Sequence, residues 1–390
     1  MAAELHTHLE PLKTRLRLGG VPLIVVGSGL SAGVGAPTMN LIHRYFEREI
    51  DPRTSQTART IHALVEILIA EPEYPRSVSV RLYHLLQTSL EETIRREWQA
   101  FGVNLLAGRL AGSSMKPLWE LEPSAGHYWV ARLATSARAI VLSLNYDGLT
   151  HRAVDAVATA GQARVLSTAE EIRQFFTGVP PPSSTSPIPI IKIRGDVFHA
   201  ECENGRCPDL GKSVPIYQLW QHRRAGASPE KARDPEERAR EYLKCPICHE
   251  PRGLQISFPG VLGKEEAIDE TLMALHQIHG SRIACVIFLG FSGQWDEALV
   301  RYLAGRAADL GAPLISFSLE PTPAIARVAE EARAEYFFRN YESKLASFDK
   351  RVSVFTSMGP PFFTSNPPPH LTRAIVRVSV FLALLPFFLF

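Results

Sequence analysis

Four of the five cysteines form two closely spaced pairs. Cys202 and Cys207 are separated by four residues, and Cys245 and Cys248 by two. Two such pairs in a polar region can place four thiolates around one tetrahedral zinc ion. The set would leave no coordination position open, which predicts a structural and not a catalytic metal. The alternatives are chance clustering of buried cysteines and replacement of one ligand by His249.

A glycine-rich segment, GSGLSAGVGAP, follows a short apolar run at residues 21–27. The pattern predicts a buried strand, a tight turn and a helix, the first unit of many nucleotide-binding α/β folds. Backbone amides at such a helix start can bind phosphate, and glycines let a ligand approach the main chain. The third glycine departs from the G-x-G-x-x-G spacing, so a tight connection without a ligand is the competing interpretation.

A second candidate site follows the apolar run at residues 138–145, where the sequence reads SLNYDG. Asn145 and Asp147 would lie at the carboxyl end of a parallel strand, where open α/β sheets bind their ligands. The same residue types are also ordinary turn formers. Ligand binding and turn formation therefore both remain open for this segment.

The elements that must position these residues follow an alternating pattern. Apolar periodicity predicts helices at 4–18, 58–70, 80–101, 150–160, 264–279, 295–310 and 322–335, and strands at 21–27, 138–145, 190–193, 283–289 and 313–319. This order predicts an α/β fold with a Rossmann-like parallel sheet, helices on both faces, an inserted zinc-ribbon module and a helical insertion.

The expected domain organisation has six parts. They are an N-terminal helix with the first βα unit (1–40), a helical insertion (41–115), the continued Rossmann-like domain (116–195), a zinc-ribbon module (196–256), the completed Rossmann-like domain (257–340) and a tail (341–390).

Several segments, taken in order, resemble motifs of the sirtuin family. GSGLSAGVGAP resembles the family's opening glycine motif, PSAGHYWVARL its P-N-x-x-H helix, and SLNYDGL its T-Q-N-I-D-G-L segment. IKIRGDVFHAEC is similar to the family's H-G-x-x-x-x-x-x-C segment, which leads into the zinc ribbon, and CPICHEPRGLQISFPG is similar to its C-P-x-C-G-G-x-L-R-P-x-V-V-x-F-G segment. FLGFSGQW stands in the place of the family's G-T-S segment, and SFSLEPT resembles its late I-N strand. The resemblance covers roughly residues 20–335, and its specificity comes from the order of individually degenerate motifs.

The resemblance implies a two-lobed enzyme that binds NAD and cleaves its nicotinamide–ribose bond. It implies that cofactor-binding residues are Gly27, Ser28, Gly29, Ser31, Gly35, Asn145, Asp147, Gly290 and Ser292, that Asn145 and Asp147 are also catalytic, and that Cys202, Cys207, Cys245 and Cys248 bind the zinc. Within that set, the first glycine loop would hold the phosphates, and the Asn145–Asp147 segment would order the ribose and the nicotinamide pocket.

The chain departs from the family pattern at the catalytic base. Arg194 stands where the family has its catalytic histidine, and a guanidinium that stays protonated cannot serve as a general base. Thr38, Met39 and Asn40 replace the family's Asp-Phe-Arg, and Leu144 replaces a glutamine. Two other histidines, His199 and His151, are close enough in sequence to act instead, although a surface role is the simpler interpretation of each.

The leading functional expectation is a sirtuin-like NAD-dependent protein-lysine deacylase with an acyl-lysine protein as partner. The alternatives are an NAD hydrolase or ADP-ribosyltransferase, and a catalytically impaired module that binds NAD or ADP-ribose. Loss of nicotinamide needs positioning and electrostatic stabilisation, whereas transfer to an acyl-lysine also needs the base. The ordered motifs therefore favour deacylation, whereas Arg194 at the position of the base argues against it.

Composition narrows the class of protein further. A hydrophobic content of 45% with 21% charged residues is ordinary for a globular chain, and a net charge of +2 gives no indication of direct nucleic-acid binding. The odd cysteine count and the N-terminus without an apolar core predict an intracellular, not a secreted, protein. The apolar segment 378–390 is short for a membrane span, so a packed or disordered tail is expected in preference to an anchor.

Overall fold

The computed structural model describes fifteen stretches of the chain. They are residues 15, 20–38, 41–42, 59, 92–110, 115–157, 163–166, 169–178, 187–210, 213–215, 234–256, 283–293, 296–318, 322–334 and 336–340. The expected helices at 4–18, 58–70 and 264–279, the first part of that at 80–101, and the tail from 341 onward lie outside the described residues, apart from Arg15 and Arg59.

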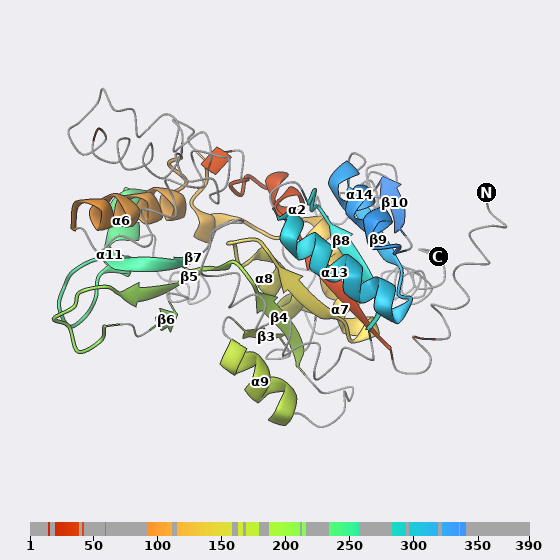
Figure 1. The fold of residues 1–390 in the computed structure, drawn as a ribbon. Coiled ribbons are helices and arrows are strands. Elements are labelled where there is room, and N and C mark those ends of the chain that lie inside the picture. Colours follow the sequence, from red (N-terminus) through yellow and green to blue (C-terminus); the bar gives the residue numbers. More distant parts are fainter. Residues whose placement is uncertain are drawn as a thin grey trace, which may run out of the picture.

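A seven-stranded sheet forms the centre of the larger lobe (Figure 1). Its strands are β1 (Val21–Val26), β2 (Ile140–Ser143), β3 (Ala163–Leu166), β4 (Ile188–Lys192), β8 (Ile283–Leu289), β9 (Leu314–Ser318) and β10 (Tyr336–Asn340). The order is β10-β9-β8-β1-β2-β4-β3, and every neighbouring pair is parallel. The chain builds outward from β1 first through β2 and then through β8, so the strand order reverses beside β1. Open α/β sheets bind ligands at the carboxyl ends of the strands at such a point.

Helices cover both faces of the sheet, as the alternating pattern predicts. On one face lie α2 (Gly29–Ala32), α7 (Ala125–Ala137) and α8 (Leu149–Val157); on the other lie α9 (Ala169–Gly178), α13 (Glu297–Leu310) and α14 (Pro323–Glu331). All six residues of β1 are buried. Leu23 and Val25 point into the core under α13 and α14, whereas Ile24 and Val26 point into the core under α7 and α8. The Rossmann-like class is therefore confirmed.

A smaller lobe lies beside the carboxyl edge of the sheet (Figure 1). It contains an antiparallel sheet in the order β6-β5-β7, made of β5 (Gly195–Cys202), β6 (Ser213–Pro215) and β7 (Arg252–Ile256). Helices α6 (Glu92–Ala107) and α11 (Pro235–Leu243) pack against each other, and α6 also packs on β7. A Cβ built on Gly102 of α6 would be 3.2 Å from the Leu254 side chain, so helix and strand are in close contact.

A short 3₁₀ helix, η1 (Leu118–Glu120), precedes α7. The structure also contains β3, α9 and β10, which apolar periodicity did not predict. Among the described residues, no helix combines the length and apolar character that crossing a membrane requires.

Candidate nucleotide site and cysteine cluster

The loops that follow β1, β8 and β2 meet at the carboxyl edge of the sheet. A Cβ on Gly27 would lie 2.6 Å from the Gly290 carbonyl oxygen, and a Cβ on Gly29 would lie 2.8 Å from the same atom. The Gly29 N–H donates to that oxygen at 2.8 Å. These two glycines are therefore required because two protein loops approach each other closely. The sequence analysis had instead attributed the glycines to the approach of a ligand.

The other residues of the glycine loop are less constrained. A Cβ on Gly33 or on Gly35 would meet no atom within 4 Å, although Gly35 has a φ of +87° that favours glycine. Ser28 is half-buried, and Ser292 in the loop after β8 is exposed. Thr38 is half-buried, whereas Met39 and Asn40 lie outside the described residues.

Ser31 on α2 is held by two side chains from distant parts of the sequence. Its Oγ accepts a hydrogen bond from Asn145 Nδ2 at 2.9 Å and lies 3.0 Å from His127 Nε2 on α7. All three side chains are buried. The contact joins the glycine loop to the segment after β2, so two sequence-predicted site residues, Ser31 and Asn145, lie together.

Asn145 leaves one polar atom without a partner. The residue is 3% exposed, and its Oδ1 accepts no hydrogen bond from any of the described residues. An isolated buried amide oxygen is energetically costly, so such atoms commonly mark where a ligand or a water is bound. Ser143 Oγ and Thr150 Oγ1, which flank this segment, are likewise buried without a described partner.

The Asp147 carboxylate has a role in the local turn. Its Oδ1 accepts a hydrogen bond from the Leu149 N–H at 3.0 Å, at the start of α8. A carboxylate at that position stabilises a helix N-terminus. Asp147 is 6% exposed. One carboxylate oxygen thus takes part in the turn, and ligand binding by this residue stays a prediction.

Lys192, at the end of β4, holds the Asn145–Asp147 segment in place. Its Nζ donates to the Asn145 main-chain oxygen at 2.7 Å and to the Asp147 main-chain oxygen. The side chain is 2% exposed. A buried ammonium that bonds two carbonyls of one loop fixes the loop's conformation, because releasing it would leave a buried charge uncompensated.

Arg194 forms a buried ion pair with Asp296, which precedes α13. The Arg194 Nε donates to Asp296 Oδ2 at 3.0 Å, and its Nη2 contacts Asp296 Oδ1. The two side chains are 3% and 4% exposed. Burial raises the pKa of neighbouring Tyr146, so that phenol stays neutral beside the pair. The guanidinium charge is thus matched by a carboxylate within the protein.

The histidines proposed as substitutes for the base have their own acidic neighbours. His151 Nε2 lies 3.0 Å from an Asp155 carboxylate oxygen on the same helix, and His199 Nδ1 lies 3.7 Å from Asp196. Leu144 packs against the apolar core on the α13 face of the sheet.

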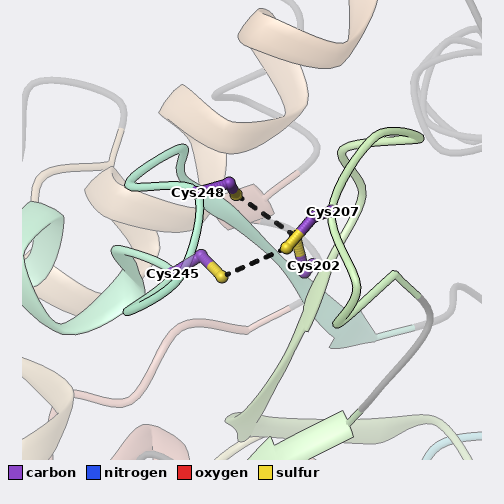
Figure 2. Close-up of side chains that lie close together, drawn as sticks. All are labelled: Cys202, Cys207, Cys245 and Cys248. Atoms are coloured by element: carbon purple, nitrogen blue, oxygen red, sulfur yellow. Dashed lines mark hydrogen bonds between the residues drawn. The ribbon is translucent and has the colours of Figure 1, made fainter.

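The four paired cysteines converge in the smaller lobe (Figure 2). Their Sγ atoms all lie within 4.8 Å of one another. Cys202 Sγ is 3.6 Å from Cys248 Sγ, and Cys207 Sγ is 3.9 Å from Cys245 Sγ. Tetrahedral zinc with Zn–S bonds of ~2.3 Å places sulfurs about 3.8 Å apart. The geometry therefore fits one zinc ion.

Nearby donors suit thiolates at this cluster. The Asp209 N–H donates to Cys207 Sγ at 3.4 Å, and Arg252 Nη2 lies 3.9 Å from Cys245 Sγ. The N–H groups of Cys248 and Ile247 lower the pKa of Cys245 to about 6. His249 is exposed and has a φ of +61°. The fifth cysteine, Cys285, is buried in β8, where burial raises its thiol pKa to about 12.

Sequence reasoning did not select three residues of this site: His127, Lys192 and Asp296. His127 lies in the quoted helix motif, but its contact with Ser31 spans 96 positions of sequence. Asp296 contacts Arg194 across 102 positions. A lysine in an otherwise apolar strand is the one local signal that could have identified Lys192.

Comparisons with known proteins add only a likeness of fold. No protein-family model matches the chain, and no curated protein matches its sequence. Among solved structures, a chain described as "The Structural basis for Sirtuin Substrate affinity" is similar with a TM-score of 0.38 and 15% identity. The match covers 87% of this chain and 94% of that chain.

Proposed function

We propose that the protein binds NAD at the carboxyl edge of its sheet and cleaves the nicotinamide–ribose bond with water as the acceptor. The observation that carries the proposal is the buried Ser31–Asn145 contact, which leaves Asn145 Oδ1 without a described partner. This atom lies at the point of strand reversal, where dinucleotides bind in folds of this class. A ligand hydroxyl group or water that donates to Oδ1 would remove the cost of the orphaned acceptor.

The proposed reaction breaks the bond between the ribose C1′ and the nicotinamide nitrogen. Nicotinamide leaves with the bonding electrons, a water oxygen forms the new bond to C1′, and one proton passes to solvent. The products are ADP-ribose and nicotinamide. Positive charge develops on the ribose in the transition state, and Asp147 and Asn145 Oδ1 supply negative potential there. Lys192 keeps their loop in position through two carbonyl groups.

The Arg194–Asp296 pair favours water over acyl-lysine as the acceptor. Deacylation in the family requires a base at this position to activate a ribose hydroxyl. Here the position is taken by a guanidinium that donates to a carboxylate and has no lone pair for a proton. We therefore do not extend the proposal to lysine deacylation, although the ordered sequence motifs made it the leading expectation.

We also propose that the cysteine cluster holds one structural zinc ion. The support is that four sulfur atoms lie at the spacing of tetrahedral zinc ligands. Four thiolates fill all four coordination positions of the ion. The metal would fold the loops that carry the two cysteine pairs and would take no part in the reaction.

The proposal is tested by incubating the purified protein with NAD and measuring nicotinamide by chromatography. Wild-type protein should release nicotinamide, and Asn145→Ala should lose about 100-fold of that rate, the usual effect of removing one preorganised polar group. Arg301→Ala, which breaks exposed ion pairs with Glu297 on α13 and Glu331 on α14, is the matched control and should retain the wild-type rate.

Two results would contradict the proposed activity in different ways. Calorimetric binding of NAD without nicotinamide release would identify a non-enzymatic binding module. No binding at millimolar NAD would exclude the nucleotide site itself.

A further inference from the structure

Two side-chain nitrogen atoms lie within hydrogen-bonding distance of the Ser31 hydroxyl oxygen. Asn145 Nδ2 donates to its Oγ at 2.9 Å, and His127 Nε2 lies 3.0 Å from the same atom. A hydroxyl group accepts two hydrogen bonds and donates one. What Ser31 can offer a ligand therefore depends on whether His127 Nε2 carries a proton.

The other face of the imidazole decides that question. The Ser124 N–H donates to His127 Nδ1 at 3.1 Å, and the Ser124 Oγ lies 2.7 Å from the same nitrogen. A nitrogen that accepts a backbone N–H cannot itself be protonated, so in the neutral ring the proton is on Nε2. Burial, the largest effect, lowers the pKa of His127, which keeps the ring neutral.

His127 Nε2–H consequently donates to Ser31 Oγ. Both acceptor positions of the hydroxyl are then occupied, by His127 and by Asn145. The remaining Ser31 O–H must point away from both donors. We propose that His127 is a positioning residue, which directs the Ser31 O–H toward an acceptor atom of the bound ligand.

This inference rests on the proposed function, since it assigns a supporting residue to the same NAD site. It adds a role for α7: the helix that covers the sheet also sets the hydrogen-bonding direction of a residue on α2. The capping box of α7, in which Ser124 and His127 bond each other, fixes the ring. A helix N-terminus thereby orders a binding side chain on another element.

Two substitutions separate this role from simple structural support. His127→Asn places an amide oxygen near the position of Nδ1, so it keeps the bond from Ser124 but loses the donor to Ser31. His127→Gln places an amide N–H₂ near the position of Nε2, so it keeps the donor but weakens the capping box. The melting temperature measures the effect of each substitution on the capping box of α7. The calorimetric affinity for ADP-ribose, with KM and kcat for NAD, measures the effect of losing the hydrogen-bond donor to Ser31.

We expect His127→Asn to melt close to wild type and to bind ADP-ribose about tenfold more weakly, the effect of one lost hydrogen bond. We expect His127→Gln to melt at a lower temperature and to bind within about twofold of wild type. Ser31→Ala should add little to the loss in His127→Asn, because both changes remove the same directed O–H.

Three results would overturn the inference. If ADP-ribose affinity follows melting temperature across both variants, His127 is merely structural. If His127→Asn binds as wild type does, the inference fails while the proposed function stands. If wild-type protein does not bind ADP-ribose or NAD, the proposed function fails and the inference fails with it.

Discussion

At the scale of single residues, Arg194 and Asp296 depend on each other because both charges are buried. Removing one member of a buried pair leaves an uncompensated charge, so Arg194→Met should lower the free energy of unfolding by about 3–5 kcal/mol. Replacing both, as Arg194→Met with Asp296→Leu, should recover most of that loss. Urea unfolding measures both variants. Equal instability of the single and double variants would show that the pair is not the cause.

His127 predicts a specific dependence of stability on pH. Burial lowers its pKa below the ordinary value of 6.5, with Asp147 raising and Lys192 lowering it by smaller amounts. The unfolded state therefore binds a proton that the folded state does not, and stability falls as the pH falls below about 6.5. The contribution reaches at most about 1.4 kcal/mol per pH unit. Between pH 7 and pH 5, the free energy of unfolding should fall less steeply in His127→Asn than in the wild type. The same dependence on pH in both proteins would contradict a buried, neutral His127.

The site residues that the sequence identified are marked by their immediate neighbours in the chain, whereas those it missed depend on contacts between distant positions. Asn145 and Asp147 follow an apolar run directly, so local pattern placed them at a strand end. Asp296 acquires its role only by contact with Arg194, from which it is 102 positions distant. A single sequence carries no local record of such a pairing. Motif analysis therefore identified Arg194 by its position but could not identify Asp296 as its partner.

At the scale of elements, the β1–α2 turn and the loop after β8 can approach each other closely because Gly29 has no side chain. Gly29→Ala would bring a Cβ within 2.8 Å of the Gly290 carbonyl oxygen, which should destabilise the protein by about 1–3 kcal/mol and weaken NAD binding. Gly33 is a matched control, because its φ of −65° is helical and a Cβ there meets open space.

Gly33→Ala should be neutral or stabilising by about 0.4–1 kcal/mol, since alanine reduces the freedom of the unfolded chain. Thermal melts with and without ADP-ribose compare the two variants. Similar behaviour of Gly29→Ala and Gly33→Ala would show that the close loop approach is unimportant.

The cysteine cluster predicts metal content and stability together. Wild-type protein should contain close to one zinc per chain, and Cys245→Ser should lose it and melt at a lower temperature, because structural zinc binding contributes to folding. Cys285→Ala is the control, since that thiol lies in β8 outside the cluster. Elemental analysis and melting curves provide the data. Metal-free wild-type protein, or unchanged melting of Cys245→Ser, would refute the zinc site.

Elements were predictable in proportion to their burial. Strands β1 and β8 are almost fully buried and read as continuous apolar runs. Strand β3 has four residues, of which only Leu166 is buried, because it lies at the edge of the sheet. Its sequence, ARVL, has no apolar run to distinguish it from a loop. The other edge strand, β10, was missed at the opposite side of the sheet.

At the scale of the whole molecule, the smaller lobe is joined to the sheet beside the candidate site. The chain passes from β4 to β5 through Arg194, and the Val197 N–H donates to the Tyr146 carbonyl oxygen at 3.1 Å. The Asn145–Asp147 segment is thus held by the larger lobe through Lys192 and by the smaller lobe through Val197. We infer that the relative position of the lobes affects the geometry of the site.

The most direct test of the account is the fate of NAD in the presence of an acetylated lysine peptide. Products of one incubation are separated by chromatography and identified by mass. The account predicts nicotinamide and ADP-ribose in equal amounts, at a rate that the peptide does not change, with the peptide still acetylated. Deacetylated peptide formed in step with nicotinamide would contradict it, because Arg194 could not then be the reason that water is the acceptor.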